Sequence, residues 1–481
     1  MRSSTSRRLA AAALAAALAG AGAHGATIDA VLLSDIHFDP FDDPTRLERL
    51  VAEPPAAWAA ILREPRSAGA DAARRALLAR CRGEGPSTTQ ALLDSALKEA
   101  HARAPDARVA IVTGDFFTHG FQCRFEHGVA PATAAGYAAF ARKTFDYVAG
   151  QVRAAFGGRP VIIALGNHDS GCGNYRQDAR DGFVAGVADA VAAAAAPHDP
   201  GPVARQFAAG GHFSLKLPEM PRVRLLVIND VPLSRHFTAC DGRPAPATGR
   251  AQLRWLERSL ADAAARHEKA WVIGHIPPGI EPWASLRGAD VCGDAGRALP
   301  LLSDGRLAEV IGRHPGLVRV GVFGHTHMDE FRVLPSARDG EDGVPLKIVP
   351  SITPASGNRP AFVVARIDAD AGDWLDYEVF VGSFPGAARI DWRAGYRFSD
   401  AYRLPSFSGR SLRFLARRLQ HDRDAAESAS RAYRDAYSPR PHLAGSSLLL
   451  GDRVWARYAC ALDRIDARSF LQCACGSGQP R

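Results

Sequence analysis

Five short polar clusters, each placed directly after an apolar run, constrain the fold of this 481-residue chain more than any other feature. The first cluster, Ser34-Asp35-Ile36-His37, follows the run 28–33. The later clusters are Gly114-Asp115, Gly166-Asn167-His168-Asp169, Gly274-His275 and Gly324-His325-Thr326-His327. In open α/β sheets, ligands bind at the carboxyl ends of the strands. We therefore expect these side chains to converge on one cleft.

The runs between the clusters alternate between two kinds of pattern. Short stretches rich in Val and Ile predict buried strands at 28–33, 109–112, 161–165, 224–228, 270–273 and 318–323. Stretches rich in Ala, Leu and Arg predict helices at 88–104, 134–156 and 249–267. Strands that alternate with helices indicate an α/β sandwich.

The character of the sequence changes after about residue 361. Two further strands are expected at 362–367 and 374–381, followed by a helical pattern over 411–437. We therefore predict a signal peptide at 1–26, a first domain at 27–365, and a C-terminal subdomain of strands then helices at 366–481.

The amino terminus has the order of an export signal. Arg2, Arg7 and Arg8 precede an apolar run over 9–18 and then small residues. The twin-arginine route stays open, and either route makes the protein periplasmic or secreted. Eight cysteines in an exported chain predict up to four disulfides. No later run is long and apolar enough to predict a transmembrane segment.

The net charge of +8 would suit a polyanionic partner. The Arg residues are nevertheless scattered, and no basic block stands out, so we do not expect a nucleic acid polymer as partner. A chain of this length does not need a metal ion to fold. Any metal site is therefore expected to be functional.

The two pairs Asp35 with His37 and His325 with His327 have the spacing of side chains on one side of a strand. Either pair alone is more often a turn beside a packed histidine. Together with the other clusters they would bury many polar groups without partners, unless metal ions supply them. Asp, Asn and His ligands without cysteine favour Zn²⁺, or else Mn²⁺ or Fe²⁺, over Ca²⁺ or Mg²⁺.

The ordered motifs Asp-x-His, Gly-Asp, Gly-Asn-His-Asp, Gly-His and Gly-His-x-His resemble those of the calcineurin-like metallophosphoesterases. The resemblance implies a four-layer α/β/β/α sandwich that binds two divalent ions. It also implies that one ion takes Asp35, His37 and His327, that the other takes Asn167, His275 and His325, and that Asp115 bridges both.

Longer matches resemble the acid sphingomyelinase and sphingomyelinase-like phosphodiesterase branch. They comprise 35–40, 274–279, 324–331, 350–354, Asn358, Pro360 and His119. The saposin-type domain of acid sphingomyelinase is not expected, because the signal leads directly into the first strand. The branch also implies a disulfide between Cys460 and Cys473.

The expected reaction is attack on phosphorus by a hydroxide that bridges the two ions. A histidine then protonates the leaving group. His168 is the first candidate and His119 the second, although His119 could also be only a loop residue near the ligands. Asp169 is expected to orient His168 without binding metal. Purple acid phosphatases have a metal-binding Tyr where this chain has Thr118, so a tyrosine–Fe³⁺ site is not expected.

The leading hypothesis is an exported hydrolase of a phosphodiester or phosphoanhydride, acting on a small-molecule phosphate ester such as a nucleotide or a phospholipid headgroup. A phosphomonoesterase or nucleotidase of the same superfamily is the alternative. A metal-binding scaffold without catalysis is disfavoured, because all seven ligand positions and both candidate acids are filled.

Overall fold

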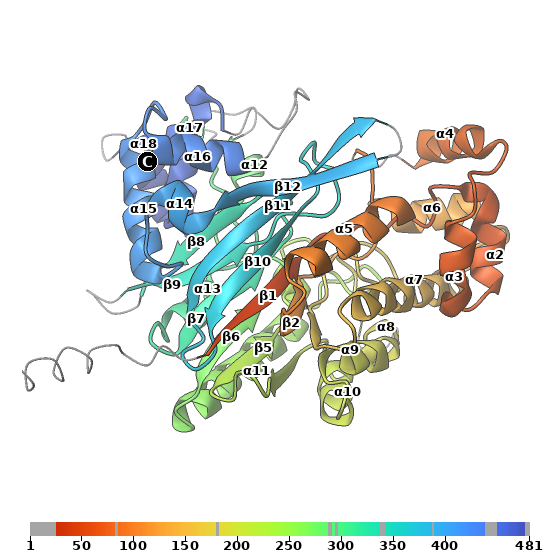
Figure 1. Cartoon of the computed structure of the whole chain (residues 1–481), viewed down its shortest axis with the longest axis horizontal. Coiled ribbons are helices and arrows are strands. Elements are labelled where there is room, and N and C mark those ends of the chain that lie inside the picture. Colours follow the sequence, from red (N-terminus) through yellow and green to blue (C-terminus); the bar gives the residue numbers. More distant parts are fainter. Residues whose placement is uncertain are drawn as a thin grey trace, which may run out of the picture.

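Two six-stranded sheets form the centre of the molecule (Figure 1). The computed structural model describes residues 26–81, 85–178, 182–286, 291–293, 297–336, 342–386, 389–437 and 450–476. The predicted signal peptide, apart from Ala26, lies outside these residues.

The first sheet has the order β12-β11-β10-β1-β2-β3. Its strands are β1 (Thr27–Leu33), β2 (Val109–Val112), β3 (Val161–Ile163), β10 (Ala361–Asp368), β11 (Trp374–Gly386) and β12 (Arg389–Arg397). The strands β1, β2 and β3 run parallel, and β10 pairs antiparallel with β1. The carboxyl ends of the first three strands therefore meet at one edge.

The second sheet has the order β4-β5-β6-β7-β9-β8. Its strands are β4 (Phe213–Lys216), β5 (Val223–Val227), β6 (Lys269–Ile273), β7 (Val318–Phe323), β8 (Glu330–Leu334) and β9 (Val344–Ile348). The pairs β5–β6, β6–β7 and β7–β9 are parallel. The clusters after β6 and β7 consequently leave this sheet from one edge.

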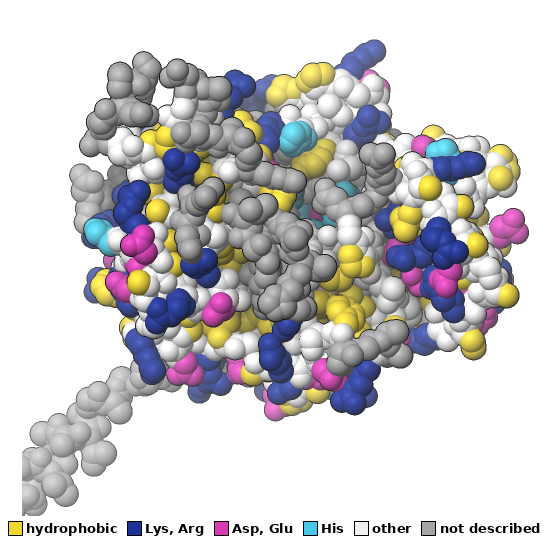
Figure 2. All heavy atoms as spheres, turned by 90° about the horizontal axis from the view of Figure 1, so that it is seen from above, with side chains coloured by type: hydrophobic (Ala, Val, Ile, Leu, Met, Phe, Trp, Pro, Cys, Tyr) yellow, Lys and Arg dark blue, Asp and Glu magenta, His cyan; other side chains and the backbone are white. Residues whose placement is uncertain are grey.

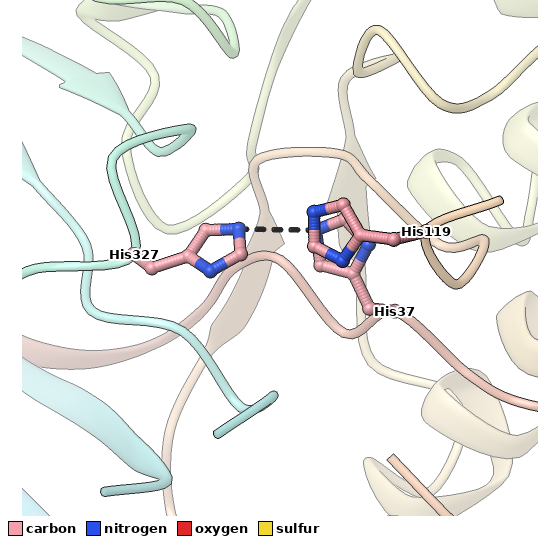
Figure 3. Close-up of side chains that lie close together, drawn as sticks. All are labelled: His37, His119 and His327. Carbon is pink, nitrogen blue, oxygen red and sulfur yellow. Dashed lines mark hydrogen bonds between the residues drawn. The ribbon is translucent and has the colours of Figure 1, made fainter. Parts of the chain in front are cut away.

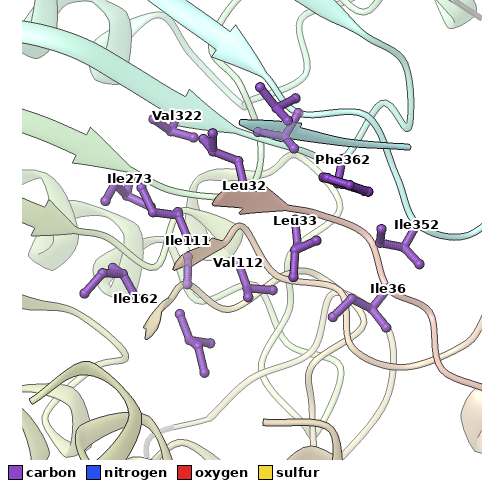
Figure 4. Close-up of a cluster of buried hydrophobic side chains, with 14 of the residues drawn as sticks. Leu32, Leu33, Ile36, Ile111, Val112, Ile162, Ile273, Val322, Ile352 and Phe362 are labelled. Atoms are coloured by element: carbon purple, nitrogen blue, oxygen red, sulfur yellow. The ribbon is translucent and has the colours of Figure 1, made fainter. Parts of the chain in front are cut away.

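Apolar side chains from both sheets share one buried core. Leu32 and Ile111 of the first sheet and Ile273 and Val322 of the second are all fully buried in it (Figure 4). Each such side chain contributes roughly 1.5–3 kcal/mol by leaving water. The core thus fixes the two sheets, and with them the loops at their edges.

Helices surround the two sheets. They are α2 (Leu47–Ala52), α3 (Pro55–Leu62), α4 (Ala70–Arg80), α5 (Gln90–Arg103), α6 (Phe121–Gly128), α7 (Ala134–Ala155), α8 (Phe183–Gly186), α9 (Ala188–Ala195), α10 (Gly201–Ala208), α11 (Pro246–Ala265), α12 (Pro282–Leu286) and α13 (Arg306–Gly312). The helices α5 and α9 pack on the first sheet, and α11 and α13 pack on the second. The expected α/β/β/α class is confirmed.

The C-terminal part combines sheet strands with a helical group. The predicted boundary at residue 366 falls inside β10, and β11 and β12 extend the first sheet. The helical group consists of α14 (Phe398–Tyr402), α15 (Gly409–His421), α16 (Ser428–Tyr437), α17 (Asp452–Tyr458) and α18 (Ala467–Cys475). It packs on the edge strand β8 through α15.

Four disulfides join all eight cysteines. They are Cys81–Cys123, Cys172–Cys240, Cys292–Cys475 and Cys460–Cys473. The pair implied by the sphingomyelinase-like branch is therefore present, and Cys475 pairs with Cys292 rather than with its neighbour Cys473. None of the helices in the described part of the chain has the length and apolar character needed to cross a membrane.

Candidate metal centre

The predicted ligands lie on tight loops at the strand ends. Asp35, His37, Asp115, His325 and His327 all have positive φ values, between 44° and 73°. Left-handed backbone is costly for residues other than glycine, and it persists where the surrounding structure holds it at functional sites. These five residues therefore occupy backbone positions typical of a site.

Glycines allow the loops to approach one another closely. A Cβ on Gly166 would lie 2.1 Å from Oδ1 of Asp115, and a Cβ on Gly324 would lie 2.0 Å from Oγ of Ser34. The loops are also tied by backbone bonds, since His37 donates to the carbonyl of Asp115 at 2.9 Å. Glycine before the ligand is thus a steric requirement at both positions.

The first group of side chains contains Asp35, His37 and His327 (Figure 3 shows the two histidines). Nε2 of His37 lies 3.1 Å from Nε2 of His327, and Nε2 of His327 lies 3.4 Å from Oδ1 of Asp35. Ligand atoms bound to one ion at about 2.0–2.2 Å lie roughly this far apart. The three side chains therefore fit one divalent cation.

The second group contains Asn167, His275 and His325. Nε2 of His275 lies 3.0 Å from Oδ1 of Asn167 and 3.3 Å from Nδ1 of His325. An amide oxygen and two imidazole nitrogens converge here at the separation that a second cation needs.

Asp115 belongs to both groups. Its Oδ2 lies 3.4 Å from Nε2 of His37 and 3.2 Å from Nε2 of His275. Its Oδ1 accepts a hydrogen bond from the backbone amide of His168 at 2.8 Å. The structure thus brings all seven predicted ligands together, with Asp115 between the two groups.

Hydrogen bonds behind the histidines orient their rings. Nδ1 of His37 donates to the carbonyl of Phe117 at 2.7 Å, and Nδ1 of His275 donates to the carbonyl of Thr113 at 2.7 Å. Such partners fix the ring and direct the other nitrogen at the metal. The donor set therefore fits a borderline ion such as Zn²⁺.

Burial and mutual charge shape the ionisation of this cluster. Burial raises the pKa of Asp35 to about 7, even though the neighbouring His275 opposes the shift. Burial would also raise the pKa of Asp115, but His275 and His168 hold it well below its usual range. Burial alone would lower the pKa of His275, but Asp115, Asp35 and Asp230 together raise it to about 10. Without metal, a proton on His275 would balance the charge of Asp115.

The two candidate acids lie beside the ligands. The ring of His119 stacks on His37 with centroids 4.1 Å apart, and it meets the ring of His168 edge-on at 4.7 Å. Both keep part of their surface exposed, and Figure 2 shows histidine side chains in a hollow on the face seen from above. Burial lowers the pKa of His168 to about 3.

Asp169 was expected to orient His168, but its hydrogen bonds are with backbone amides. Its two carboxylate oxygens accept hydrogen bonds from the backbone amides of Asp115, Phe116 and Gly166 at 2.7–2.9 Å. Asp169 therefore holds the loop that carries Asp115.

Sequence reasoning missed several residues that support the ligands. Asp230 accepts from the backbone amides of His275 and Ile276 at 2.8 and 3.1 Å. Ser34 donates to Asp35, and Ser356 contacts Nδ1 of His327 at 2.9 Å. The one available signal was the position of Asp230, three residues after β5, at the same edge of the sheet as the clusters.

Comparisons with known proteins find relatives of this sequence. A model of the calcineurin-like phosphoesterase family matches residues 30–329. Sphingomyelin phosphodiesterase of Homo sapiens is 29% identical over 293 residues, which cover 56% of this chain and 41% of that protein. The cyclic GMP-AMP phosphodiesterase SMPDL3A of Bos taurus is 24% identical over 322 residues, with 65% and 66% coverage.

A third relative is the acid sphingomyelinase-like phosphodiesterase 3b of Homo sapiens, 24% identical over 346 residues, with 68% and 69% coverage. The chain thus spans between 41% and 69% of the lengths of these three proteins. The expected resemblance is confirmed at modest identity. Because the family match covers more than half of the 481 residues and includes all five clusters, the chain belongs to the calcineurin-like phosphoesterase family.

Proposed function

We propose that the chain is an exported hydrolase that cleaves phosphate diesters or anhydrides with two bound divalent ions, most suitably Zn²⁺. The observation that carries the proposal is the position of Asp115, whose Oδ2 lies within 3.4 Å of a ligand nitrogen in each group. One carboxylate shared by two sets of donors sets the spacing of two cations. The names of the relatives support phosphodiester chemistry.

The metal ions and the side chains that hold them have separate roles in the proposed reaction. When bound, the two ions would neutralise the phosphate and supply an activated water for attack. The chain holds the ion positions through Asp115, and Asp169 fixes the loop of Asp115 through three amide bonds. Hydrogen bonds at Nδ1 hold His37 and His275 in the orientation for binding.

Protonation of the leaving group falls to His168, with His119 beside it. The backbone amide of His168 donates to Asp115, and a ring nitrogen of His168 lies within 4.8 Å of a carboxylate oxygen of Asp115. Burial keeps His168 neutral in the free protein, with a pKa of about 3. An anionic substrate beside the ring would favour its protonated form. His168 can then deliver that proton to the leaving oxygen.

The substrate class proposed is a small phosphate ester, either a nucleotide or a phospholipid headgroup. Lys and Arg side chains are spread over the face seen in Figure 2 and do not form one basic block. This distribution supports a small ligand over a polymer, which would need a continuous basic track.

A substrate panel tests the activity. Purified protein with measured zinc content would be assayed with bis-p-nitrophenyl phosphate, p-nitrophenyl phosphate, sphingomyelin, cyclic GMP-AMP and ATP. We expect the diester to be hydrolysed faster than the monoester. A faster monoester would favour the phosphomonoesterase alternative. No turnover at two ions per chain would refute the enzyme and leave a metal-binding scaffold.

Export is supported by the four disulfides, since such bonds persist in oxidising compartments. The test compares the full chain with a variant that lacks residues 1–26, both expressed in a bacterium and fractionated. The full chain should appear in the periplasm or medium and lose those residues. Retention of both forms in the cytoplasm would refute export.

A further inference from the structure

Asn167 is the one neutral amide among the seven predicted ligands, and an amide can face a cation from either end. Only its oxygen can bind a metal, because the NH₂ end is a donor. The side chain is held with Oδ1 toward His275, at 3.0 Å from Nε2. Its Nδ2 donates to Oδ1 of Asn174 at 2.9 Å. That hydrogen bond distinguishes the two ends of the amide.

Asn174 lies on a short loop that the chain ties down at several points. The amide of Tyr175 donates to the carbonyl of Asn167 at 2.8 Å, which closes the loop onto the ligand. The amide of Cys172 donates to Oγ of Ser170 at 3.1 Å. The position of Asn174 is therefore set by backbone bonds, although its own side chain is exposed.

A second segment braces this loop from outside. The disulfide between Cys172 and Cys240 joins it to the segment after β5, with Cα atoms 5.5 Å apart. Beside the disulfide, the amide of Thr238 donates to the carbonyl of Tyr175 at 3.2 Å, and the amide of Gln177 donates to the carbonyl of Thr238 at 3.3 Å. The same loop also contacts a second predicted ligand, since the hydroxyl of Tyr175 lies 3.5 Å from Nε2 of His325.

We propose that Asn174 is a positioning residue for the second metal group, and that the Cys172–Cys240 disulfide is the strut that keeps it in place. Asn174 acts by accepting the proton of Nδ2, so that the oxygen of Asn167 faces the cation. The inference rests on the proposed function, because it takes Asn167, His275 and His325 as metal ligands. It assigns the strut to one half of the centre, whereas Asp35, His37 and His327 depend on other loops.

Metal binding gives the direct test. Zinc affinity would be measured for both steps by competition with a chelator, and zinc content by mass spectrometry after dialysis. Asn174→Ala should weaken one of the two steps by about 10–100-fold, the usual cost of losing a partner behind a ligand. Asn174→Asp has the same shape and keeps an acceptor oxygen, so it should retain both ions.

A double-mutant cycle shows whether the effect passes through Asn167. Asn167→Ala should weaken the same binding step, and adding Asn174→Ala in that background should weaken that step no further. An equal loss in both backgrounds would overturn the assignment, because Asn174 would then act on the centre by another route.

The strut has its own control. Cys172→Ser with Cys240→Ser should weaken the same step as Asn174→Ala, whereas Cys460→Ser with Cys473→Ser, which removes a bond in the helical group, should leave both steps unchanged. Equal zinc affinities in the two double variants would overturn the role of the strut. If the wild-type chain binds fewer than two ions, the proposed function fails. If it binds two and Asn174→Ala binds them equally well, only this inference fails.

Discussion

Nε2 of His37 lies 3.1 Å from Nε2 of His327, so a proton or a cation must separate two lone pairs that would otherwise repel. The Nδ1–H of His37 is used by the carbonyl of Phe117, which leaves its Nε2 as an acceptor. Burial, with the adjacent His119, lowers the pKa of both histidines well below the usual range. A divalent ion suits this gap better than an additional proton.

His327→Ala is therefore expected to remove one ion per chain and to lower turnover by more than about 100-fold, because the remaining ion lacks its partner charge. Zinc content and initial rates measured on the same sample would check this. Ser356→Ala removes only the partner of Nδ1 and should cost about 10-fold in affinity. A variant of His327 that keeps two ions would contradict the ligand assignment.

His168→Ala should keep both ions and lose about 10²–10⁴-fold in turnover, because a positioned proton donor is removed while the ligands stay. The loss should be large for alkyl leaving groups and small for p-nitrophenolate, which leaves without protonation. Rates with both leaving groups, together with zinc content, measure this. His119→Ala, tested in parallel, should show a similar leaving-group dependence if it shares the role. Loss of zinc from the His168 variant would place that residue among the ligands.

Loading of the second ion should release about one proton per chain at pH 7. In the metal-free protein the pKa of His275 is raised to about 10, because the combined effect of Asp115, Asp35 and Asp230 outweighs burial. A cation needs the lone pair that this proton occupies, so affinity should rise with pH up to the raised pKa. Calorimetry in two buffers with different ionisation enthalpies would count the proton. Identical heats in both buffers would contradict the prediction.

A buried ion pair lies at the second sheet, where α15 of the helical group packs on β8 and β9. Lys347 on β9 donates to Asp329 and to the carbonyl of Glu330, and its ammonium lies 5.0 Å from the ring centroid of Tyr377. Lys347 and Asp329 are both almost fully buried. Lys347→Met would leave the carboxylate of Asp329 without its cation, and should destabilise the fold by about 3–5 kcal/mol.

Urea unfolding would measure that loss. The exposed pair of Arg49 and Glu64 is the control, and Arg49→Met should cost less than about 1 kcal/mol. The double variant Lys347→Met with Asp329→Leu should recover much of the loss, since no buried charge remains. Equal destabilisation by the Lys347 and Arg49 variants would contradict the buried pair.

The parts that sequence reasoning located have strong local signals. The strands β2 and β7 occur at the predicted residues, because continuous apolar runs between turn residues mark buried parallel strands. The strands β4, β8, β9 and β12 were not predicted. β12 alternates Ile390, Trp392, Ala394 and Tyr396 with charged residues and glycine, so its period-two signal was present in the sequence but was missed.

The predicted helix over 411–437 shows the same limit. It is divided into α15 and α16 at Asp422, whose carboxylate accepts from the amides of Ala426 and Glu427 at 2.9 and 2.8 Å.

In the metal centre, the ligands stand in recognisable motifs, whereas supporting residues such as Asp230 and Asn174 lie in ordinary loop sequence. Their roles depend on which loops meet in space, which residue spacing does not encode.

Asp146 in α7 gives a prediction on stability that is independent of the metal centre. Burial raises the pKa of its carboxyl to about 6, although Arg142 opposes the shift. A raised folded-state pKa means that ionisation costs stability: the cost is absent below the unfolded value of about 4 and grows until pH 6. Asp146→Asn should therefore raise the melting temperature at pH 7 and have little effect at pH 4. Thermal unfolding of both proteins at the two pH values measures this, and an equal shift at both would show that the gain does not come from removing the charge.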